Sequence, residues 1–325
     1  MGLQIMKEFK KEELTKLFRP HDNSNGEDNG QITIIGGSEL FHGAPILALK
    51  TASRIVDMVF FATPEKSVGM VAELIKSKLM SFIWIPWDDL SAYIEKSDAI
   101  LIGPGFMRFG SEKTPESDRH FDNHNEGKTT REITEKLLKK FPLKKWVIDA
   151  GSLQTMDAEW IPENAIITPN KKEFETLFGA KFSTGLATEM AKKYKCIIVA
   201  KGPESYVTSA DETVLIKGGN AGMTKGGTGD ILAGLTVALL AKNEPFLSAC
   251  AASYIEKAAA DELYCGYQED HGLQPVDELS SDMSSSLGKP RSSGRGGRHK
   301  KVGTNYNADD LADFIPEYFK MVLAD

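Results

Sequence analysis

Short apolar runs alternate with stretches of helical periodicity along most of the chain. Runs rich in Ile, Val and Phe predict buried strands, and apolar positions spaced three and four apart predict helices. The predicted strands lie at 32–37, 58–63, 81–86, 98–105, 145–151, 165–170 and 196–202. The predicted helices lie at 45–57, 67–79, 88–96, 131–141, 171–179, 187–194, 228–242, 245–264 and 308–320. This alternation predicts a three-layer α/β/α fold, in which helices cover both faces of a mostly parallel sheet.

Three segments depart from the alternation. Residues 205–210 and 213–219 follow a strand directly and predict an antiparallel hairpin in the sheet. Residues 110–130 are polar and predict an exposed loop. Residues 279–301 are rich in Ser, Gly and basic side chains, a composition that buries too little apolar area to offset the entropy of ordering. We expect that insert to be disordered and solvated, although its charge leaves contact with a partner open.

These departures predict how the chain is divided. Residues 1–30 form a lead-in that begins with a short amphipathic helix, and residues 31–268 form one large α/β domain. Residues 269–303 hold the basic insert, and residues 304–325 return a closing helix to the domain.

Composition narrows the class of protein. The chain has 325 residues, a net charge of −7 and a pI of about 5.5, which disfavours a general nucleic-acid or membrane-surface binder. Its three cysteines are odd in number and form no CxxC pair, so we expect a reducing compartment and a cytoplasmic protein. The first residues lack the apolar core of a signal peptide, and no run is long enough to span a bilayer.

The segment 220–234, NAGMTKGGTGDILAG, carries the strongest chemical signal. Gly222, Gly226, Gly227 and Gly229 crowd a turn that enters an apolar helix directly. Glycine lets a backbone approach a ligand closely, and the free N–H groups at a helix N-terminus attract anions. We therefore expect this loop to bind the phosphates of a nucleotide.

Asp230 stands in the first turn of that helix, beside the predicted phosphate site. Because like charges repel, its carboxylate is poorly suited to hold a phosphate. It is suited to accept a proton from a hydroxyl as a phosphoryl group is transferred. An aspartate here can also simply cap the helix, and the pattern alone leaves both interpretations open.

The segment 168–179, TPNKKEFETLFG, places Asn170 and Glu173 where a predicted strand gives way to a helix. Open α/β sheets bind ligands at the carboxyl ends of their strands. Glu173 could there hold a hydrated Mg²⁺ indirectly, beside phosphates. The same two residues also fit a variant of the capping box, which would make their role structural.

Three further turns follow predicted strands, at 34–45, 101–106 and 199–205. At 199–205, a lysine followed by Gly-Pro could contact a phosphate or an adenine edge, or could simply turn the strand into the hairpin. The tight Gly-Pro-Gly turn at 101–106 could receive a substrate, and 34–45 is another glycine-rich turn from strand to helix. Asp149 ends another predicted strand at the same edge. It could orient a metal ion, or it could simply be a turn residue. The first turn does not match the GxGxxG dinucleotide spacing, and GKTT at 127–130 lacks the leading glycine of a Walker loop.

These strand-end motifs, in this order, resemble the ribokinase-like superfamily, and most closely its ADP- or ATP-dependent NAD(P)H-hydrate dehydratases. The matching segments are GGSELFHGAPILALKTA, AILIGPG, VIDAGSL, ITPNKKEFETLFG, IVAKGPES and NAGMTKGGTGDILAGLTVALLA. The last is the most specific, because related sugar and vitamin kinases share its GxGD core but rarely its full context. The resemblance covers about residues 30–265 and resumes weakly at 304–320.

The resemblance implies a repair reaction. NADH and NADPH damaged by hydration of the nicotinamide ring (NADHX and NADPHX) are phosphorylated on the ring hydroxyl with ADP or ATP, and phosphate is then eliminated. Phosphoryl transfer itself leads us to expect Mg²⁺ as cofactor, and the resemblance also implies a homo-oligomer. Only about 30 residues precede the first predicted strand, so we expect a separate epimerase to act upstream.

The resemblance also implies roles for single residues. Ala44 and Gly105 match positions that contact the hydrate, and Asn170 stands where many members have histidine. Asp230 matches the acid that contacts the substrate and would deprotonate its hydroxyl. The implied nucleotide-binding residues are Lys201, Gly202, Pro203, Glu204, Ser205, Gly226, Gly227, Thr228 and Gly229.

Two other functions fit parts of the pattern. A small-molecule kinase of the same superfamily would share the Asp230 loop but would stop at the phosphorylated product. A nucleotide sensor without catalysis would have no use for a carboxylate beside the phosphates, so Asp230 argues against it.

Overall fold

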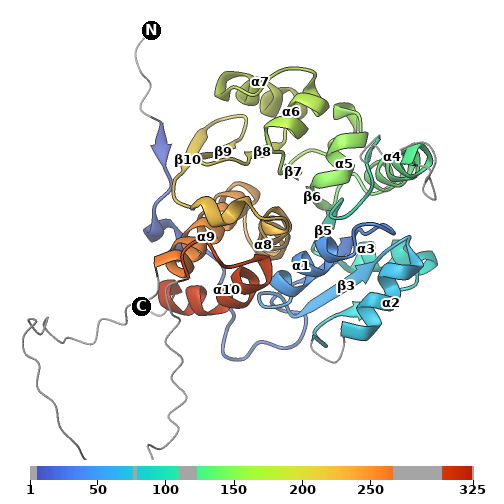
Figure 1. The fold of residues 1–325 in the computed structure, drawn as a ribbon, viewed down its shortest axis with the longest axis horizontal. Helices are drawn as coiled ribbons and strands as arrows, with labels where there is room; N and C mark the ends of the chain where they lie inside the picture. Colours follow the sequence, from blue (N-terminus) through green and yellow to red (C-terminus); the bar gives the residue numbers. More distant parts are fainter. Residues whose placement is uncertain (1–5, 76–78, 110–122, 266–301, 324–325) are drawn as a thin grey trace, which may run out of the picture.

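The structure is a computed structural model that describes residues 6–75, 79–109, 123–265 and 302–323. Its strands are β1 (Lys7–Glu8), β2 (Gln31–Ile35), β3 (Met58–Ala62), β4 (Ile83–Trp84), β5 (Ala99–Ile102), β6 (Lys145–Ile148), β7 (Ile166–Ile167), β8 (Ile197–Ala200), β9 (Ser205–Thr208) and β10 (Thr213–Ile216). They form one sheet in the order β1-β10-β9-β8-β7-β6-β5-β2-β3-β4. Figure 1 shows this sheet between two sets of helices.

Helices cover both faces of the sheet. One face carries α1 (Gly43–Ala52), α2 (Lys66–Ile75), α8 (Thr228–Lys242), α9 (Pro245–Cys265) and α10 (Ala308–Leu323). The other carries α3 (Leu90–Lys96), α4 (Asn123–Lys140), α5 (Ala150–Thr155), α6 (Lys171–Phe178) and α7 (Thr184–Tyr194). Short 3₁₀ turns complete the set: η1 (Lys11–Lys16), η2 (Trp87–Asp89), η4 (Ala158–Trp160) and η5 (Ala221–Thr224). The predicted three-layer fold is confirmed.

The side chains of the central strands divide between two hydrophobic cores. In β5, Ala99 and Leu101 enter the core under α8 and α9, whereas Ile100 and Ile102 enter the core under α3 and α4. All four are fully buried. A strand that is buried on both faces has a continuous apolar sequence, which is why these strands were visible as uninterrupted runs.

The sheet is parallel except around β9, which runs antiparallel to β8 and to β10. The pair β9–β10 is the predicted hairpin, and Thr208 lies opposite Thr213 at its closed end. The hairpin is therefore confirmed.

Three local predictions were wrong. Residues 6–17, expected in an amphipathic helix, instead form β1, which pairs in parallel with β10, and the 3₁₀ turn η1. Residues 123–130, expected in a loop, belong to α4. The strand expected to reach residue 151 ends at Ile148. Asp149 is the N-cap of α5, which begins at Ala150, so the last residues of the predicted strand belong to a helix.

Several predictions concern the segments that the structure leaves out. Residues 110–122 and the basic insert 279–301 lie outside the described residues, so the proposed division at 269–303 stays a prediction.

Figure 1 shows α10, near the end of the chain, lying beside α1, near its beginning. The three cysteines are free thiols. Within the described ranges, none of the helices combines the length and the apolar character that crossing a membrane requires.

Candidate active site at the strand ends

The carboxyl ends of β6, β7 and β8 meet at one edge of the sheet. Asp149 follows β6, Asn170 follows β7 and Lys201 follows β8. A parallel bridge between Asn170 and Lys201 extends the pairing of β7 and β8 by one step. The predicted site residues of these three turns are therefore neighbours in space.

Lys201 lies at the centre of a buried group of charges. Its Nζ is 2.7 Å from Asp149 Oδ1 and 3.7 Å from Glu173 Oε2. The Thr168 hydroxyl donates to the same Asp149 oxygen at 2.7 Å. Burial opposes the charge of Lys201, yet the two carboxylates outweigh it and raise the pKa of the ammonium. Lys201 therefore stays charged.

Asp230 lies against this group from the first turn of α8 and is half-buried. Burial raises the pKa of Asp230 to about 7, the charge of Asp149 adds to the effect, and Lys201 opposes it. A carboxyl that titrates near neutral pH is matched to accepting and returning a proton. We call Asp149, Glu173, Lys201 and Asp230 the charged corner.

The helix cap at the start of α8 is Gly227 rather than Asp230. Gly227 has φ 99°, and no side chain caps this helix end. This position favours glycine, because a Cβ there would lie 2.5 Å from Leu47 Cδ1 and 2.8 Å from Ala308 Cβ. Asp230 therefore makes no capping hydrogen bond in the structure, and its interpretation as a simple helix cap lacks support.

The rest of the glycine loop lies open beside Lys201. A Cβ on Gly226 would meet nothing within 4 Å, and one on Gly229 would lie 3.5 Å from Lys201 Nζ. Thr228 donates its hydroxyl to the Met223 carbonyl at 2.9 Å, which shapes the loop from within. The loop therefore leaves space for a ligand next to the charged corner.

Asn220 fixes the beginning of this loop. Its Nδ2 donates to the Ala260 carbonyl at 2.9 Å and to Asp261 Oδ1 at 3.0 Å, both on α9. Its Oδ1 accepts from the backbone N–H of Gly222 and from the hydroxyl of Tyr306, each at 2.9 Å. Tyr306 lies two residues before the start of α10, so the loop is held by two distant parts of the chain.

Glu173 and Asn170 form the capping box that their spacing allowed. The Asn170 side chain accepts from the backbone N–H of Glu173, and Glu173 Oε2 accepts from that of Asn170 at 2.8 Å. Glu173 Oε1 accepts from Gln154 at 3.1 Å, so both of its oxygens are occupied. Burial raises the pKa of Glu173, and Lys201 partly offsets this.

The turns after β2 and β5 form a second region, the glycine corner, made of residues 36–37 and 103–105. The Gly37 N–H donates to the Pro104 carbonyl at 2.9 Å. A Cβ on Gly105 would lie 2.6 Å from the Phe41 carbonyl, and one on Gly103 would lie 1.9 Å from the Asp149 carbonyl. Gly105 thus lies beside Phe41 and Pro45, which flank Ala44 at the start of α1.

Ala44 is half-buried in the first turn of α1. Leu47, one turn further along α1, touches Gly227 of the phosphate loop. The two positions predicted to contact the hydrate and the loop predicted to bind phosphates therefore share one edge of the sheet.

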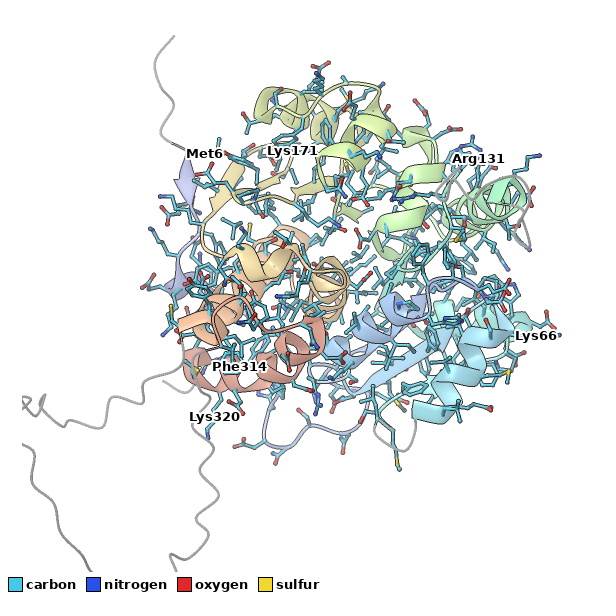
Figure 2. All side chains as sticks on the ribbon, viewed as in Figure 1. Met6, Lys66, Arg131, Lys171, Phe314 and Lys320 are labelled. Carbon is cyan, nitrogen blue, oxygen red and sulfur yellow. The ribbon has the colours of Figure 1, made fainter. Side chains whose placement is uncertain are left out.

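The turn at 201–205 borders a cavity of about 460 Å³. The lining residues are Lys171, Phe182, Ser183, Thr184, Ala200, Lys201, Pro203, Glu204 and Tyr206. Three predicted nucleotide-binding residues are among them, and Figure 2 marks Lys171 at the start of α6. The hydroxyl of Ser205 donates to the Gly202 carbonyl at 3.3 Å, so its side chain shapes the turn itself.

Sequence reasoning missed Gln154, Tyr306 and Lys257, which bond to Glu173, Asn220 and the carbonyls of the 202–203 turn, respectively. Each comes from an element far away in the chain, and none stands in a recognisable motif. Among the residues that the structure describes, no group of three His, Cys, Asp or Glu side chains is arranged to hold a metal ion.

Comparison with known proteins gives a consistent result. A family model described as NAD(P)H-hydrate dehydratase matches residues 32–280. A bifunctional NAD(P)H-hydrate repair enzyme of Methanocaldococcus jannaschii is 34% identical over 261 residues, which are 77% of this chain and 47% of that enzyme. The ADP-dependent (S)-NAD(P)H-hydrate dehydratase of Nitrosopumilus maritimus is 30% identical over 276 residues, 76% of this chain and 86% of that enzyme. The chain spans about half the length of the bifunctional relatives.

Solved structures show the same fold. A ribokinase-like superfamily protein of Enterococcus faecalis has a TM-score of 0.70 at 18% identity, over 99% of this chain and 98% of that one. The ADP/ATP-dependent NAD(P)H-hydrate dehydratase of Bacillus subtilis, co-crystallised with ATP and Mg²⁺, has a TM-score of 0.67 at 20% identity, over 98% and 99% of the two chains.

Proposed function

The chain belongs to the NAD(P)H-hydrate dehydratase family, and from that membership we propose that it dehydrates the S epimers of hydrated NADH and NADPH with ADP or ATP as phosphoryl donor. The observation that carries the proposal is Asp230, a carboxyl with a pKa of about 7 at the edge of an open glycine loop. Such a group has a use in proton transfer and none in simple phosphate binding.

Asp230 acts in the first step. The ring hydroxyl of the hydrate attacks the terminal phosphorus of the donor, and its proton passes to the Asp230 carboxylate as the phosphorus–oxygen bond to the donor breaks. The N–H groups at the start of α8, around Gly227 and Gly229, stabilise the charge that develops on the transferred group.

The second step needs little from the protein. The electron pair of the ring nitrogen expels the phosphate, and loss of a ring proton restores the carbon–carbon double bond. Phosphorylation therefore serves to convert a poor leaving group, hydroxide, into a good one. In this scheme Ala44, Gly105 and Asn170 hold the hydrated ring at the edge of the sheet.

The nucleotide would lie along the 201–205 turn and reach the glycine loop with its phosphates. Three lines of support are the cavity beside Lys201, Pro203 and Glu204, the approach of Gly229 to Lys201 Nζ, and the open space at Gly226. The B. subtilis protein of similar fold was crystallised with ATP and Mg²⁺.

Mg²⁺ would be bound with the nucleotide and would neutralise phosphate charge. Lys201 Nζ already lies between Asp149 and Glu173, and the described residues hold no group of three metal-ligating side chains, so the nucleotide phosphates would supply most of the ligands of this cation. Glu173 is suited only to a contact through water, since Asn170 and Gln154 occupy its oxygens.

We also propose a homo-oligomer in the cytoplasm that works downstream of a separate epimerase. An epimerase is needed because a single S-specific enzyme leaves the other epimer unrepaired. The free thiols of the three cysteines support a reducing compartment.

A small-molecule kinase is the second candidate, because kinases of this superfamily share the GxGD core around Asp230. The two functions differ in whether phosphate leaves the phosphorylated product.

The test uses purified protein, Mg²⁺ and hydrated NADH, with ADP and ATP supplied separately. The near-ultraviolet absorbance of reduced nicotinamide should return only when a donor is present, and the more effective nucleotide identifies the donor. Donor consumption by folded protein without return of that absorbance would replace the dehydratase with a kinase.

A further inference from the structure

Lys257 lies in the middle of α9, and its side chain is buried at 4% exposure. Its Nζ donates to the carbonyls of Gly202 at 3.1 Å, Pro203 at 2.7 Å and Gly218 at 2.9 Å. A lysine ammonium has three N–H donors, so these three bonds use all of them.

The three carbonyls belong to two separate segments of the chain. Gly202 and Pro203 lie in the turn after β8, whereas Gly218 follows β10 and leads into the phosphate loop. A single atom, Lys257 Nζ, therefore bonds to both segments, next to the β9–β10 ladder in which Ser205 lies opposite Ile216.

The same face of α9 holds the phosphate loop at a second point. Asp261, one helical turn after Lys257, accepts from the backbone N–H of Gly219 at 2.8 Å and from Asn220 Nδ2 at 3.0 Å. Gly218 and Gly219 have φ values of 96° and 83°, so the chain turns sharply where α9 holds it. A Cβ on Gly219 would lie 3.4 Å from Lys257 Nζ, which shows how closely the turn follows the lysine.

Burying an ammonium among carbonyls is a weak way to gain stability. Desolvation of the ammonium costs free energy, and hydrogen bonds to carbonyl groups offset less of that cost than an ion pair would. Burial accordingly lowers the pKa of Lys257, against the opposing charges of Glu256 and Asp261. An apolar residue at this position would leave the Pro203 and Gly218 carbonyls without the Lys257 donor, while the Gly202 carbonyl would keep the Ser205 hydroxyl at 3.3 Å.

We propose that Lys257 is a positioning residue that fixes the 201–205 turn against the 220–230 loop and thereby sets the affinity for the nucleotide donor. This inference rests on the proposed function only in taking both segments as parts of one nucleotide site. A nucleotide that contacts both must find them at a fixed separation, and Lys257 supplies the shared anchor.

The test measures ADP and ATP binding by calorimetry in the absence of hydrate, so that it does not depend on dehydration. Lys257→Met keeps the stem and removes the donors, and we expect the Kd for nucleotide to rise about 10-fold or more. Lys257→Gln keeps two donors on a shorter stem and should fall between Met and wild type. If hydrated NADH proves to be the substrate, its KM should change little in both variants.

Two control variants separate positioning from stability. Lys136→Met removes an exposed lysine of α4 and should leave nucleotide binding unchanged. Leu138→Ala removes core packing on the opposite face of the sheet and should lower thermal stability without changing the Kd. If Lys257→Met and Lys257→Gln melt lower but bind nucleotide like wild type, Lys257 is only a structural residue and the proposal is overturned. If wild type binds no nucleotide, the proposed function itself fails.

Discussion

The charged corner and the glycine corner lie at the same edge of one sheet, yet they are built in opposite ways. The charged corner gathers ionisable side chains, with Lys201 Nζ 2.7 Å from Asp149 Oδ1. In the glycine corner, backbone groups meet directly, as where the Gly37 N–H bonds to the Pro104 carbonyl at 2.9 Å. Under the proposed function, phosphoryl transfer would need charge at one place and close access at the other, and the two corners differ in the same way.

Because of this difference, substitutions in the two corners should affect different properties of the protein, namely catalysis in one and folding in the other. An isosteric change in the charged corner alters a charge while leaving the volume unchanged, so function should suffer more than folding. Any side chain added to the glycine corner must displace backbone, so folding should suffer first. The following changes test that division.

Gly103→Ala should give the largest effect on stability. Its Cβ would lie 1.9 Å from the Asp149 carbonyl, at a φ of 119° that alanine rarely adopts. We expect a loss of more than about 3 kcal/mol in the free energy of unfolding, or no soluble protein. Denaturant unfolding measures it. Gly185→Ala in α7, where a Cβ meets nothing within 4 Å, is the matched control and should be neutral or stabilising. Equal stability of the two variants would contradict this account of the glycine corner.

Asp230→Asn should lower turnover by roughly 10² or more, because a general base is lost. The amide has the same shape as the carboxylate, so ADP binding should remain near that of wild type. Steady-state kinetics and calorimetry on the same preparation give both quantities. Near-normal turnover would show that Asp230 takes no part in proton transfer.

The pH dependence of Asp230 should be visible in both rate and stability. Burial raises its pKa in the folded protein to about 7, above the value of about 3.9 in an unfolded chain. The stabilisation of the protonated form is therefore present at low pH and is lost as the pH rises from about 4 to 7. Compared with wild type, Asp230→Asn should gain stability at pH 8, by a few kcal/mol at most, and little near pH 4.

Two pH series measure this effect. Thermal unfolding across pH shows whether the difference between variant and wild type grows above neutrality. Wild-type kcat/KM should rise with pH to a plateau above about 7, because the carboxylate is the active form. A stability difference that is the same at every pH would rule out a raised pKa.

Asn170→Ala should give the smallest effect, a loss of about 1 kcal/mol, because it removes the cap of α6. Asn170→Ser keeps a capping oxygen and should retain most of that stability. The KM for the hydrate tests the other role that the resemblance implies. If both variants bind the hydrate like wild type, Asn170 is a helix cap alone.

The sequence predicted what is encoded locally. Uninterrupted runs such as the one ending at Ile102 predicted the central strands because both of their faces are buried. The glycine loop and Asp230 were visible because phosphate binding at a helix start requires particular residues at fixed spacing.

What the sequence left out depends on distant contacts. The polar start of α4 looked like a loop, since exposed helical residues carry little apolar periodicity. Two-residue β1 is a strand only because β10 is there to pair with it. Lys257 and Tyr306 acquire their roles from carbonyl and amide groups that lie 39 to 86 positions away.

The bond between Tyr306 and Asn220 also bears on the order in which the site is assembled. A ribosome makes the phosphate loop long before it makes Tyr306, so the emerging chain holds that loop from one side only. The second support, at 2.9 Å, arrives with the final helix. A chain released before residue 306 would therefore carry every residue of the charged corner without the support that Tyr306 gives to the neighbouring loop.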